Sequence, residues 1–205
     1  MNGSDADETS AEAPTVGDGV DDPVVEPAVT EAVASTATAA HARLKGIDRA
    51  VRPDRVSSIL VAVGAGPHTG ATVDVAREVA DATDAWLELF HVVPSDEALV
   101  DGDATAVDGD GDVDEYAAAG DRLLSAARDR LGDFDRVDRW LVEDLTAAGA
   151  IVEQSPYYDL VIVGASTTGT VGRFVFGSTT DTVVDDAEVP VVVVGADGET
   201  SLDAE

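Results

Sequence analysis

From residue 57 to residue 195 the sequence alternates between short apolar runs and longer stretches of mixed polarity, and this alternation limits the fold more than any other feature. The apolar runs contain many β-branched residues and little polar alternation, which is typical of strands buried on both faces of a sheet. Between them lie stretches long enough for helices, as in βαβ units. We therefore predict an α/β domain with a doubly wound, five-stranded parallel sheet. The predicted strands lie in SSILVAVG (57–64), WLELFHVV (86–93), RWLVE (139–143), DLVIVG (159–164) and VPVVVVG (189–195).

Helices are predicted where apolar residues recur every three or four positions between these strands. The clearest stretch is 69–83, in which Ala71, Val75 and Val79 share one face of a helix. The acidic, glycine-dotted stretch 94–112 is predicted to be a long loop. The remaining predicted helices are 113–131, 145–155 and 178–187.

The two ends of the chain differ in composition from this domain. Residues 1–28 contain much Asp, Glu, Gly, Ser, Pro and Ala without periodicity, so we predict a disordered acidic tail. Residues 29–54 combine helix-forming residues with the polar joint VRPDR, and we predict a marginal helix and a linker there. The folded domain is predicted to span 55–196, and residues 197–205 to form a second acidic tail that frays.

Charge limits the partners of the chain. It has 42 acidic and 12 basic residues, a net charge of −30, and Lys45 is its only lysine. This charge repels nucleic-acid phosphates and anionic lipids, so we expect no nucleic-acid partner and no insertion into a membrane. The scarcity of lysine beside abundant Asp, Ala, Val and Thr resembles the proteins of halophiles that accumulate salt. With no secretory signal and no apolar run near the ~18 residues of a membrane span, we expect a cytoplasmic protein.

Some classes of site are excluded by the residue types present. The chain has no cysteine, so it has no disulfides, thiolate metal sites or cysteine nucleophile. Asp108, Asp110 and Asp112 imitate the start of an EF-hand loop, but Val113 stands at its glycine position and Ala119 at its twelfth position, so no selective calcium site is expected.

The first glycine-rich loop, VGAGPHTG, follows the first predicted strand. Gly64 and Gly66 invite a dinucleotide-binding interpretation, but the third glycine is Gly70, one position too late, and the second strand ends in Pro94 where an acidic residue would bind a ribose. No lysine lies near the loop, which excludes a P-loop NTPase.

The second loop follows the strand DLVIVG and contains Gly164, Gly169 and Gly177. Ser178 and Thr179 stand at the start of the next predicted helix, where free backbone amides and the helix dipole favour an anion. An alternative is that Ser178 only caps the helix and the glycines only turn the chain. The residues alone leave both interpretations open.

The order of elements, together with ILVAVG, LFHVVP, DLVIVG, FVFGS and VPVVVV, resembles the universal stress protein family over residues 55–195. The resemblance implies an adenine-nucleotide alpha-hydrolase-like fold with strand order 3-2-1-4-5 and a homodimer through the last strand. Its ATP-binding branch has Gly, two residues, Gly, nine residues, then Gly-Ser or Gly-Thr. Here Gly164 and Gly177-Ser178 fit that frame, but Thr167 replaces the middle glycine. Gly64 stands where ATP-binding relatives have an aspartate.

The resemblance also implies positions for a ligand. The backbone of Val92 would lie against an adenine, Gly164 near the ribose, and Gly177, Ser178 and Thr179 around the phosphates, with Gly64 and Gly169 in the adjoining loops. ATP is the one cofactor that this pattern suggests, although no cofactor is certain. His68 and His91 lie near this crevice without a placed nucleophile, so no catalytic residue and no enzyme activity are expected.

We therefore predict a non-catalytic stress-response or regulatory protein that acts through binding and dimerisation. The first alternative is an adenine-nucleotide-binding member of the same family. The second is a regulatory partner of a membrane transporter, which the glycine spacing Gly164, Gly169, Gly177 suggests because it looks like a branch found in transporter domains of halophiles.

Overall fold

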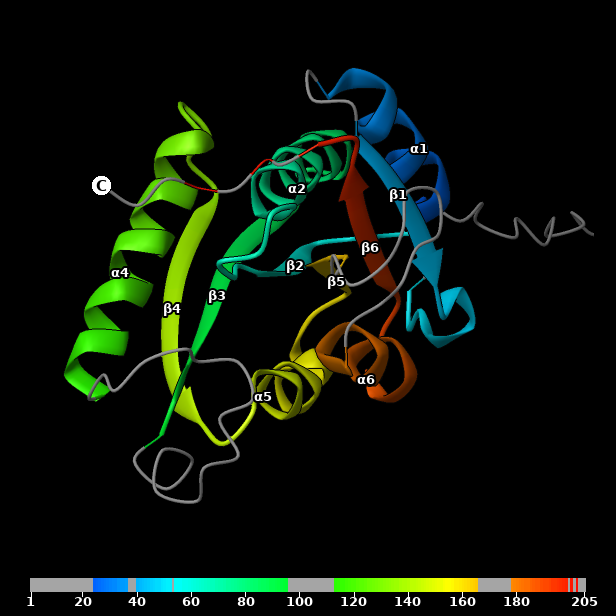
Figure 1. Cartoon of the computed structure of the whole chain (residues 1–205). Helices are drawn as coiled ribbons and strands as arrows, with labels where there is room; N and C mark the ends of the chain where they lie inside the picture. Colours follow the sequence, from blue (N-terminus) through cyan, green and yellow to red (C-terminus); the bar gives the residue numbers. More distant parts are fainter. Residues whose placement is uncertain are drawn as a thin grey trace, which may run out of the picture.

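The structure is a computed structural model that describes residues 24–36, 40–52, 54–95, 113–165, 178–198, 200 and 202. Six strands form one sheet, and helices cover both of its faces (Figure 1). The strands are β1 (Ala40–Lys45), β2 (Ser58–Ala62), β3 (Trp86–Pro94), β4 (Val137–Asp144), β5 (Leu160–Gly164) and β6 (Val191–Ala196). The helices are α1 (Val25–Ser35), α2 (Thr69–Thr83), α4 (Val113–Arg130), α5 (Ala147–Gln154) and α6 (Ser178–Asp186), with short 3-10 turns η1 (Ile47–Arg49) and η2 (Ser155–Tyr157).

The sheet order is β1-β6-β5-β2-β3-β4. Strands β2 to β6 are all parallel to one another and, numbered among themselves, have the predicted order 3-2-1-4-5. The doubly wound α/β prediction is therefore confirmed. The predicted count of five strands was wrong, because β1 adds a sixth strand, antiparallel to β6.

The segment before the predicted domain also differs from expectation. Residues 25–28, predicted to belong to a disordered tail, form the first turn of α1, and residues 40–45, predicted to be helix or linker, form β1. The strand forms because β6 offers a free edge, and residues 40 to 45 pair with 196 to 191 along it. This tertiary contact overrides the helix propensity of an alanine-rich stretch.

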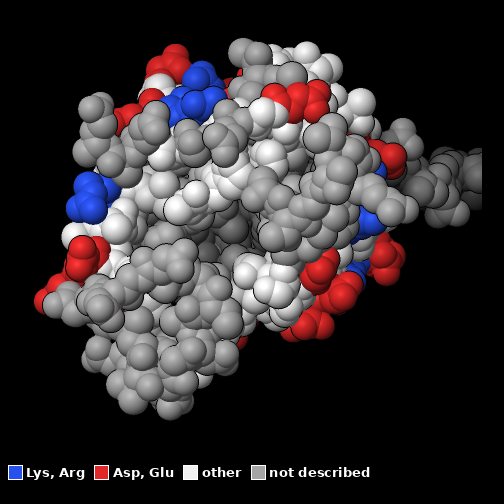
Figure 2. Space-filling model, viewed as in Figure 1, with Lys and Arg blue, Asp and Glu red and all other residues white. Residues whose placement is uncertain are grey.

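The charged residues lie mainly at the rim of the face shown in Figure 2, where acidic side chains outnumber basic ones. The described ion pairs are at the surface, such as Arg130 with Asp74 and Arg77 with Asp133. In the described part of the chain, no helix has both the length and the apolar character that crossing a bilayer requires.

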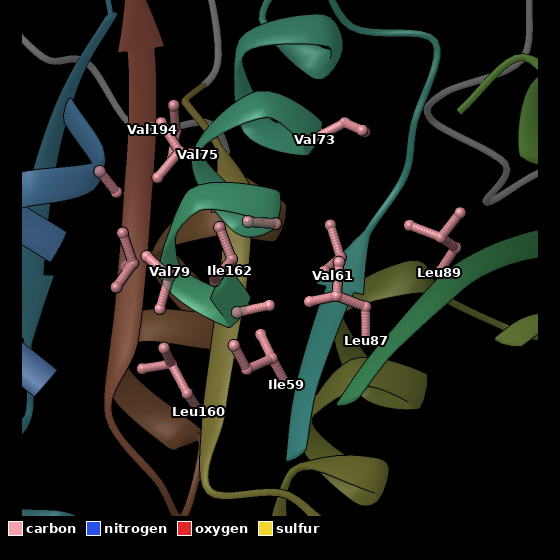
Figure 3. Packing of buried hydrophobic residues seen from close by; sticks show 14 of the residues in the cluster. Ile59, Val61, Val73, Val75, Val79, Leu87, Leu89, Leu160, Ile162 and Val194 are labelled. Carbon is pink, nitrogen blue, oxygen red and sulfur yellow. The ribbon is translucent and has the colours of Figure 1, made fainter. Parts of the chain in front are cut away.

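Each strand of the parallel sheet sends alternate side chains to opposite faces, so two apolar layers form. On one face Ile59, Val61 and Ile162 pack against Val75 and Val79 of α2 (Figure 3). On the other face the strands pack against α5 and α6 through a second cluster that contains Leu60, Phe90, Val161, Ile151 and Val183. Helices on both faces bury the central residues 59–61 of β2 and residues 160–163 of β5, which explains their unbroken apolar sequences.

The segment after β6 was predicted to fray, but two of its residues contact the domain. Thr200 donates its backbone N–H to Pro67 O (2.6 Å) and accepts a hydrogen bond from Gly70 N–H on its own carbonyl (2.6 Å). Its hydroxyl oxygen accepts from Ala71 N–H (3.1 Å). Leu202 packs against the apolar cluster on the α2 face.

Candidate functional site

A cavity of about 200 Å³ opens at the carboxyl ends of β2, β3 and β5. β2 is followed by α2 on one face of the sheet, whereas β5 is preceded by α5 on the other face, so the winding direction changes between these two strands. Ligands of parallel α/β sheets bind at such switch points. The starts of α2, α5 and α6 all contribute residues to the lining, namely the N-cap His68 with Thr69, Ala147, and Thr179 with Thr180.

Val92 presents backbone groups to this cavity. Val63 N–H, just past the end of β2, donates to Phe90 O (2.9 Å), whereas Ser95 N–H donates to the carbonyl of Asp144 at the end of β4 (3.0 Å). Because backbone groups of successive residues point to opposite neighbours, even-numbered residues of β3 face β2. The β2–β3 pairing ends at Ala62 and Phe90, so the N–H and C=O of Val92 point past the end of β2 into the cavity that Val92 lines.

Two glycines at the strand ends differ in the space around them. A side chain at Gly64 would meet nothing closer than Gly66 N at 4.0 Å, so this position is open. At Gly164 an added Cβ would lie 3.2 Å from Thr72 Oγ1, because α2 packs closely against the end of β5. The carbonyl of Gly164 accepts a hydrogen bond from Thr180 Oγ1 (3.1 Å), which joins the start of α6 to β5.

Two of the three helix starts already have partners for their free amides. At α2, Gly70 and Ala71 donate to Thr200, and an added Cβ on Gly70 would overlap Thr200 O. At α5, Thr146 Oγ1 accepts from Gly149 N–H (3.1 Å). At the start of α6, Thr179 is exposed and lines the cavity, and Ser178 is exposed beside it. The start of this helix therefore borders the cavity, and helix starts favour anions.

The two imidazoles at the cavity favour their neutral forms. Nδ1 of His91 donates to Val63 O (2.6 Å), and burial lowers the pKa of this histidine, although that hydrogen bond opposes the shift. Burial and then the nearby His41 lower the pKa of His68. Within the described residues, Nδ1 of His68 is buried and has no hydrogen-bond partner. The described lining carries no lysine or arginine.

The structure brings four of the predicted site residues together: Gly64, Val92, Gly164 and Thr179 line one cavity. Ser178 lies beside them at the start of α6, while Gly169 and Gly177 lie outside the described residues. The predicted calcium-like aspartates 108, 110 and 112 also lie outside them. Among described residues, no group of three His, Asp or Glu side chains is arranged to hold a metal ion.

Sequence patterns did not identify the residues that form the apolar wall of the cavity or those that hold the chain next to it. Ile151 and Val183 supply its apolar wall from α5 and α6. Thr69, whose hydroxyl donates to Gly64 O (2.5 Å) and Gly66 O (2.8 Å), holds the turn after β2. A threonine or serine at a helix start is a signal for such a turn, but no sequence signal identifies Thr200.

Comparison with known proteins gives a consistent picture. A model of the universal stress protein family matches residues 56–195. The universal stress protein UspA from Lactobacillus plantarum is similar in structure, with a TM-score of 0.54, 22% identity, and coverage of 69% of this chain and 99% of the other. A universal stress protein from Archaeoglobus fulgidus has a TM-score of 0.54 and 19% identity, covering 68% and 98%.

A third similar structure is a universal stress protein in complex with cAMP, with a TM-score of 0.53, 17% identity, and coverage of 69% of this chain and 99% of the other. No curated protein matches the chain. At these identities the likenesses to solved structures show the fold alone.

Proposed function

Since the chain belongs to the universal stress protein family, we propose that it is a non-catalytic regulatory protein whose cavity binds an adenine nucleotide. The observation that carries this proposal is the cavity at the switch point, where Val92 presents backbone groups beside an exposed helix start. Binding of the nucleotide at this site would act as a signal to a partner in the cell. The protein would not convert the nucleotide into another compound.

The base end of the cavity suits adenine. The N–H of Val92 is a donor and its C=O an acceptor, which matches the N1 acceptor and the exocyclic amino donor on one edge of adenine. Ile151, Val163 and Val183 supply apolar contact beside this edge. A mostly apolar cavity with a few placed polar groups is the usual form of a small-molecule site.

The phosphate end would lie at α6. The first backbone amides of a helix and its dipole favour negative charge, and Thr179 adds a hydroxyl at this point. Because no described cation lines the cavity, uncharged donors would supply most of the phosphate contacts. Gly177 and Ser178, which the sequence pattern places around the phosphates, belong to the same segment of chain.

Several features support nucleotide binding without catalysis. The shifted pKa values keep His68 and His91 neutral at neutral pH, and Nδ1 of His91 is engaged with Val63 O. The hydroxyl groups of Thr69 and Thr180 donate to backbone carbonyls. A nucleophile held against a general base, which hydrolysis by the protein would need, is not part of the described lining. The similar protein that was solved in complex with cAMP supports an adenine nucleotide as ligand.

Two of the expectations from sequence have less support, namely the homodimer and the transporter partnership. Dimerisation through the last strand is not part of this proposal, because β1 already pairs with the edge of β6 on which that expectation rested. A partnership with a transporter rests on the spacing of Gly164, Gly169 and Gly177, and two of these glycines lie outside the described residues.

Equilibrium dialysis in concentrated KCl with AMP, cAMP and ATP tests the proposal, with GMP as the control for the base. We expect adenine nucleotides to bind and GMP to bind at least tenfold more weakly, because its edge reverses the donor and acceptor. Saturating concentrations of all three adenine nucleotides without measurable binding would contradict the proposal.

A pair of variants tests whether the phosphate of the nucleotide lies at the start of α6. Thr179→Asp puts a carboxylate at the cavity, whereas Thr182→Asp makes the same change one turn further along α6, outside the lining. We expect Thr179→Asp to weaken nucleotide binding tenfold or more and Thr182→Asp to leave it nearly unchanged. Equal effects of the two variants would show that the phosphate does not lie at the start of α6.

A further inference from the structure

Residues 24–36 and 40–50, called here the N-terminal unit, lie outside the residues that match the family model. Figure 1 shows α1 of this unit beside α2, and β1 at the edge of the sheet next to β6. The unit is therefore an addition to the family domain, placed against its last strand. Its contacts show what it does there.

The unit packs against the domain through apolar side chains and through hydrogen bonds. Val25 and Val29 of α1 are buried in the apolar cluster on the α2 face, at 1% and 5% exposure. Ala42 and Leu44 of β1 pack against the same cluster. Behind β1, the Arg49 guanidinium donates to Val184 O (2.8 Å) and Ala187 O (2.9 Å), the free carbonyls at the end of α6.

The pairing of β1 with β6 has one specific register. His41 lies opposite Gly195, and an added Cβ on Gly195 would lie 2.6 Å from His41 Nε2. The imidazole thus occupies the space that a side chain of β6 would take. Because a shift of one residue moves every side chain of a strand to the other face, this contact fixes the strand in place.

The two outer strands of the parallel sheet, β4 and β6, differ in whether their side chains discourage pairing with a strand of another chain. β4 carries Asp138, Arg139, Glu143 and Asp144, and charges of this kind discourage edge-to-edge pairing. β6 reads VVVVGA, has no charge and is buried along its whole length. Without β1, its N–H and C=O groups would form a flat apolar edge open to pairing.

We propose that the edge of β6 is a strand-docking surface and that the N-terminal unit is its built-in occupant, which keeps the chain monomeric at this edge. The partner that the uncovered surface fits is a second copy of β6. Two copies related by a two-fold axis would pair antiparallel, as β1 does, with valines facing valines and no charge opposing them. β1 thus takes the place of a second chain's strand.

Engineered disulfides test whether the occupant comes from the same chain, and the chain has no cysteine of its own. Ala42 and Val194 lie directly opposite each other in the β1–β6 pairing. We expect Ala42→Cys/Val194→Cys to oxidise within one chain, giving a single-chain mass on a non-reducing gel and by light scattering. Disulfide-linked dimers would overturn the proposal, because they would show that β1 is exchanged between chains.

Release of β1 tests the docking surface. Leu44→Asp places a charge against the apolar cluster, whereas Val51→Asp makes a similar change at a side chain that is 81% exposed, just beyond the unit. By sedimentation in concentrated KCl, we expect wild type and Val51→Asp to be single chains and Leu44→Asp to form concentration-dependent dimers. Oxidising the 42–194 disulfide in the Leu44→Asp background should restore the single chain.

Two results would overturn the proposal here. One is a dimer of the Ala42→Cys/Val194→Cys variant that persists with the 42–194 disulfide closed within each chain. The other is a monomeric Leu44→Asp variant whose 191–196 amides exchange rapidly, because the edge would then be open without attracting a second copy. If circular dichroism shows that Leu44→Asp does not fold, the proposal is tested by Ala42→Cys/Val194→Cys alone, because that variant removes no packing contact of Leu44.

Discussion

Single glycines decide what the ends of β2 and β5 can accept. Gly164 leaves little room for a side chain, because an added Cβ would lie 3.2 Å from Thr72 Oγ1 of α2. Gly64 has open space beside it and its backbone is not left-handed, so any residue could stand there. The backbone at position 64 therefore does not require a glycine.

Gly64→Asp should consequently strengthen binding of ribonucleotides. A carboxylate at the end of β2 would accept hydrogen bonds from ribose hydroxyls, and a hydrogen bond to a charged group contributes about 1.5–3 kcal/mol, or tenfold and more in affinity. Calorimetry with AMP measures the change. Gly64→Ala controls for loss of the glycine, and an adenine nucleotide without ribose hydroxyls controls for the contact. An equal gain in either control would refute this explanation.

His91 should make stability depend on pH. Burial lowers its pKa below the ordinary 6.5, so the unfolded chain takes up a proton at a higher pH than the folded chain does. The free energy of unfolding should therefore fall as pH drops below about 6.5, by at most about 1.4 kcal/mol per pH unit for one histidine. Urea titrations at fixed KCl concentration, for wild type and His91→Gln, measure this slope. The prediction fails if the two slopes agree between pH 7 and pH 5.

At the scale of elements, most of the fold could be predicted from sequence. β2, β5 and β6 are unbroken apolar runs, and only a sheet covered on both faces explains such runs. β1 was not predicted because AHARLK is half polar and alanine-rich, and it becomes a strand only through the edge of β6. A contact across 150 residues leaves no local pattern.

The candidate site was predicted to a similar extent. The resemblance to the family implied that Val92 and Gly164 lie at the crevice, and both lie near the ends of strands that meet at the switch point. The part played by Thr200 could not, because the acidic stretch around it has no periodicity that would indicate docking on α2. Sequence patterns thus located the crevice but not the segments of chain that surround it.

Arg49 should stabilise α6 from a distance in sequence. It donates to carbonyls at the end of that helix, where a cation also meets the negative end of the dipole. Arg49→Ala should lower the free energy of unfolding by about 1–2 kcal/mol and raise exchange of the 183–187 amides. Arg52→Ala is the matched control, because Arg52 is 57% exposed and 3.5 Å from Asp159. If Arg49→Ala lowers the free energy of unfolding no more than Arg52→Ala does, Arg49 does not stabilise the end of α6.

At the scale of the whole molecule, charge dominates. The net charge of −30 works against the compact state, and the described ion pairs lie at the surface, where each contributes little. The screening length falls from roughly 10 Å at 0.1 M salt to roughly 3 Å at 1 M. Repulsion among the carboxylates should therefore decrease steeply over this range.

Thermal stability should accordingly rise with salt. We expect the unfolding temperature to increase from dilute buffer to about 1 M KCl, the range over which screening shortens most. Scanning calorimetry measures it, and sucrose at equal osmolality controls for exclusion of solutes from the surface. If KCl raised the unfolding temperature no more than sucrose, repulsion between carboxylates would not be the cause.

The pairing of β1 with β6 also sets an order of events during synthesis. β1 leaves the ribosome long before β6 is synthesised. Its apolar side chains therefore have no pairing strand while the intervening domain is made. Closing so distant a contact is slow relative to local folding. The earliest strand of this sheet is therefore among the last to find its place, and the growing chain must tolerate it unpaired until then.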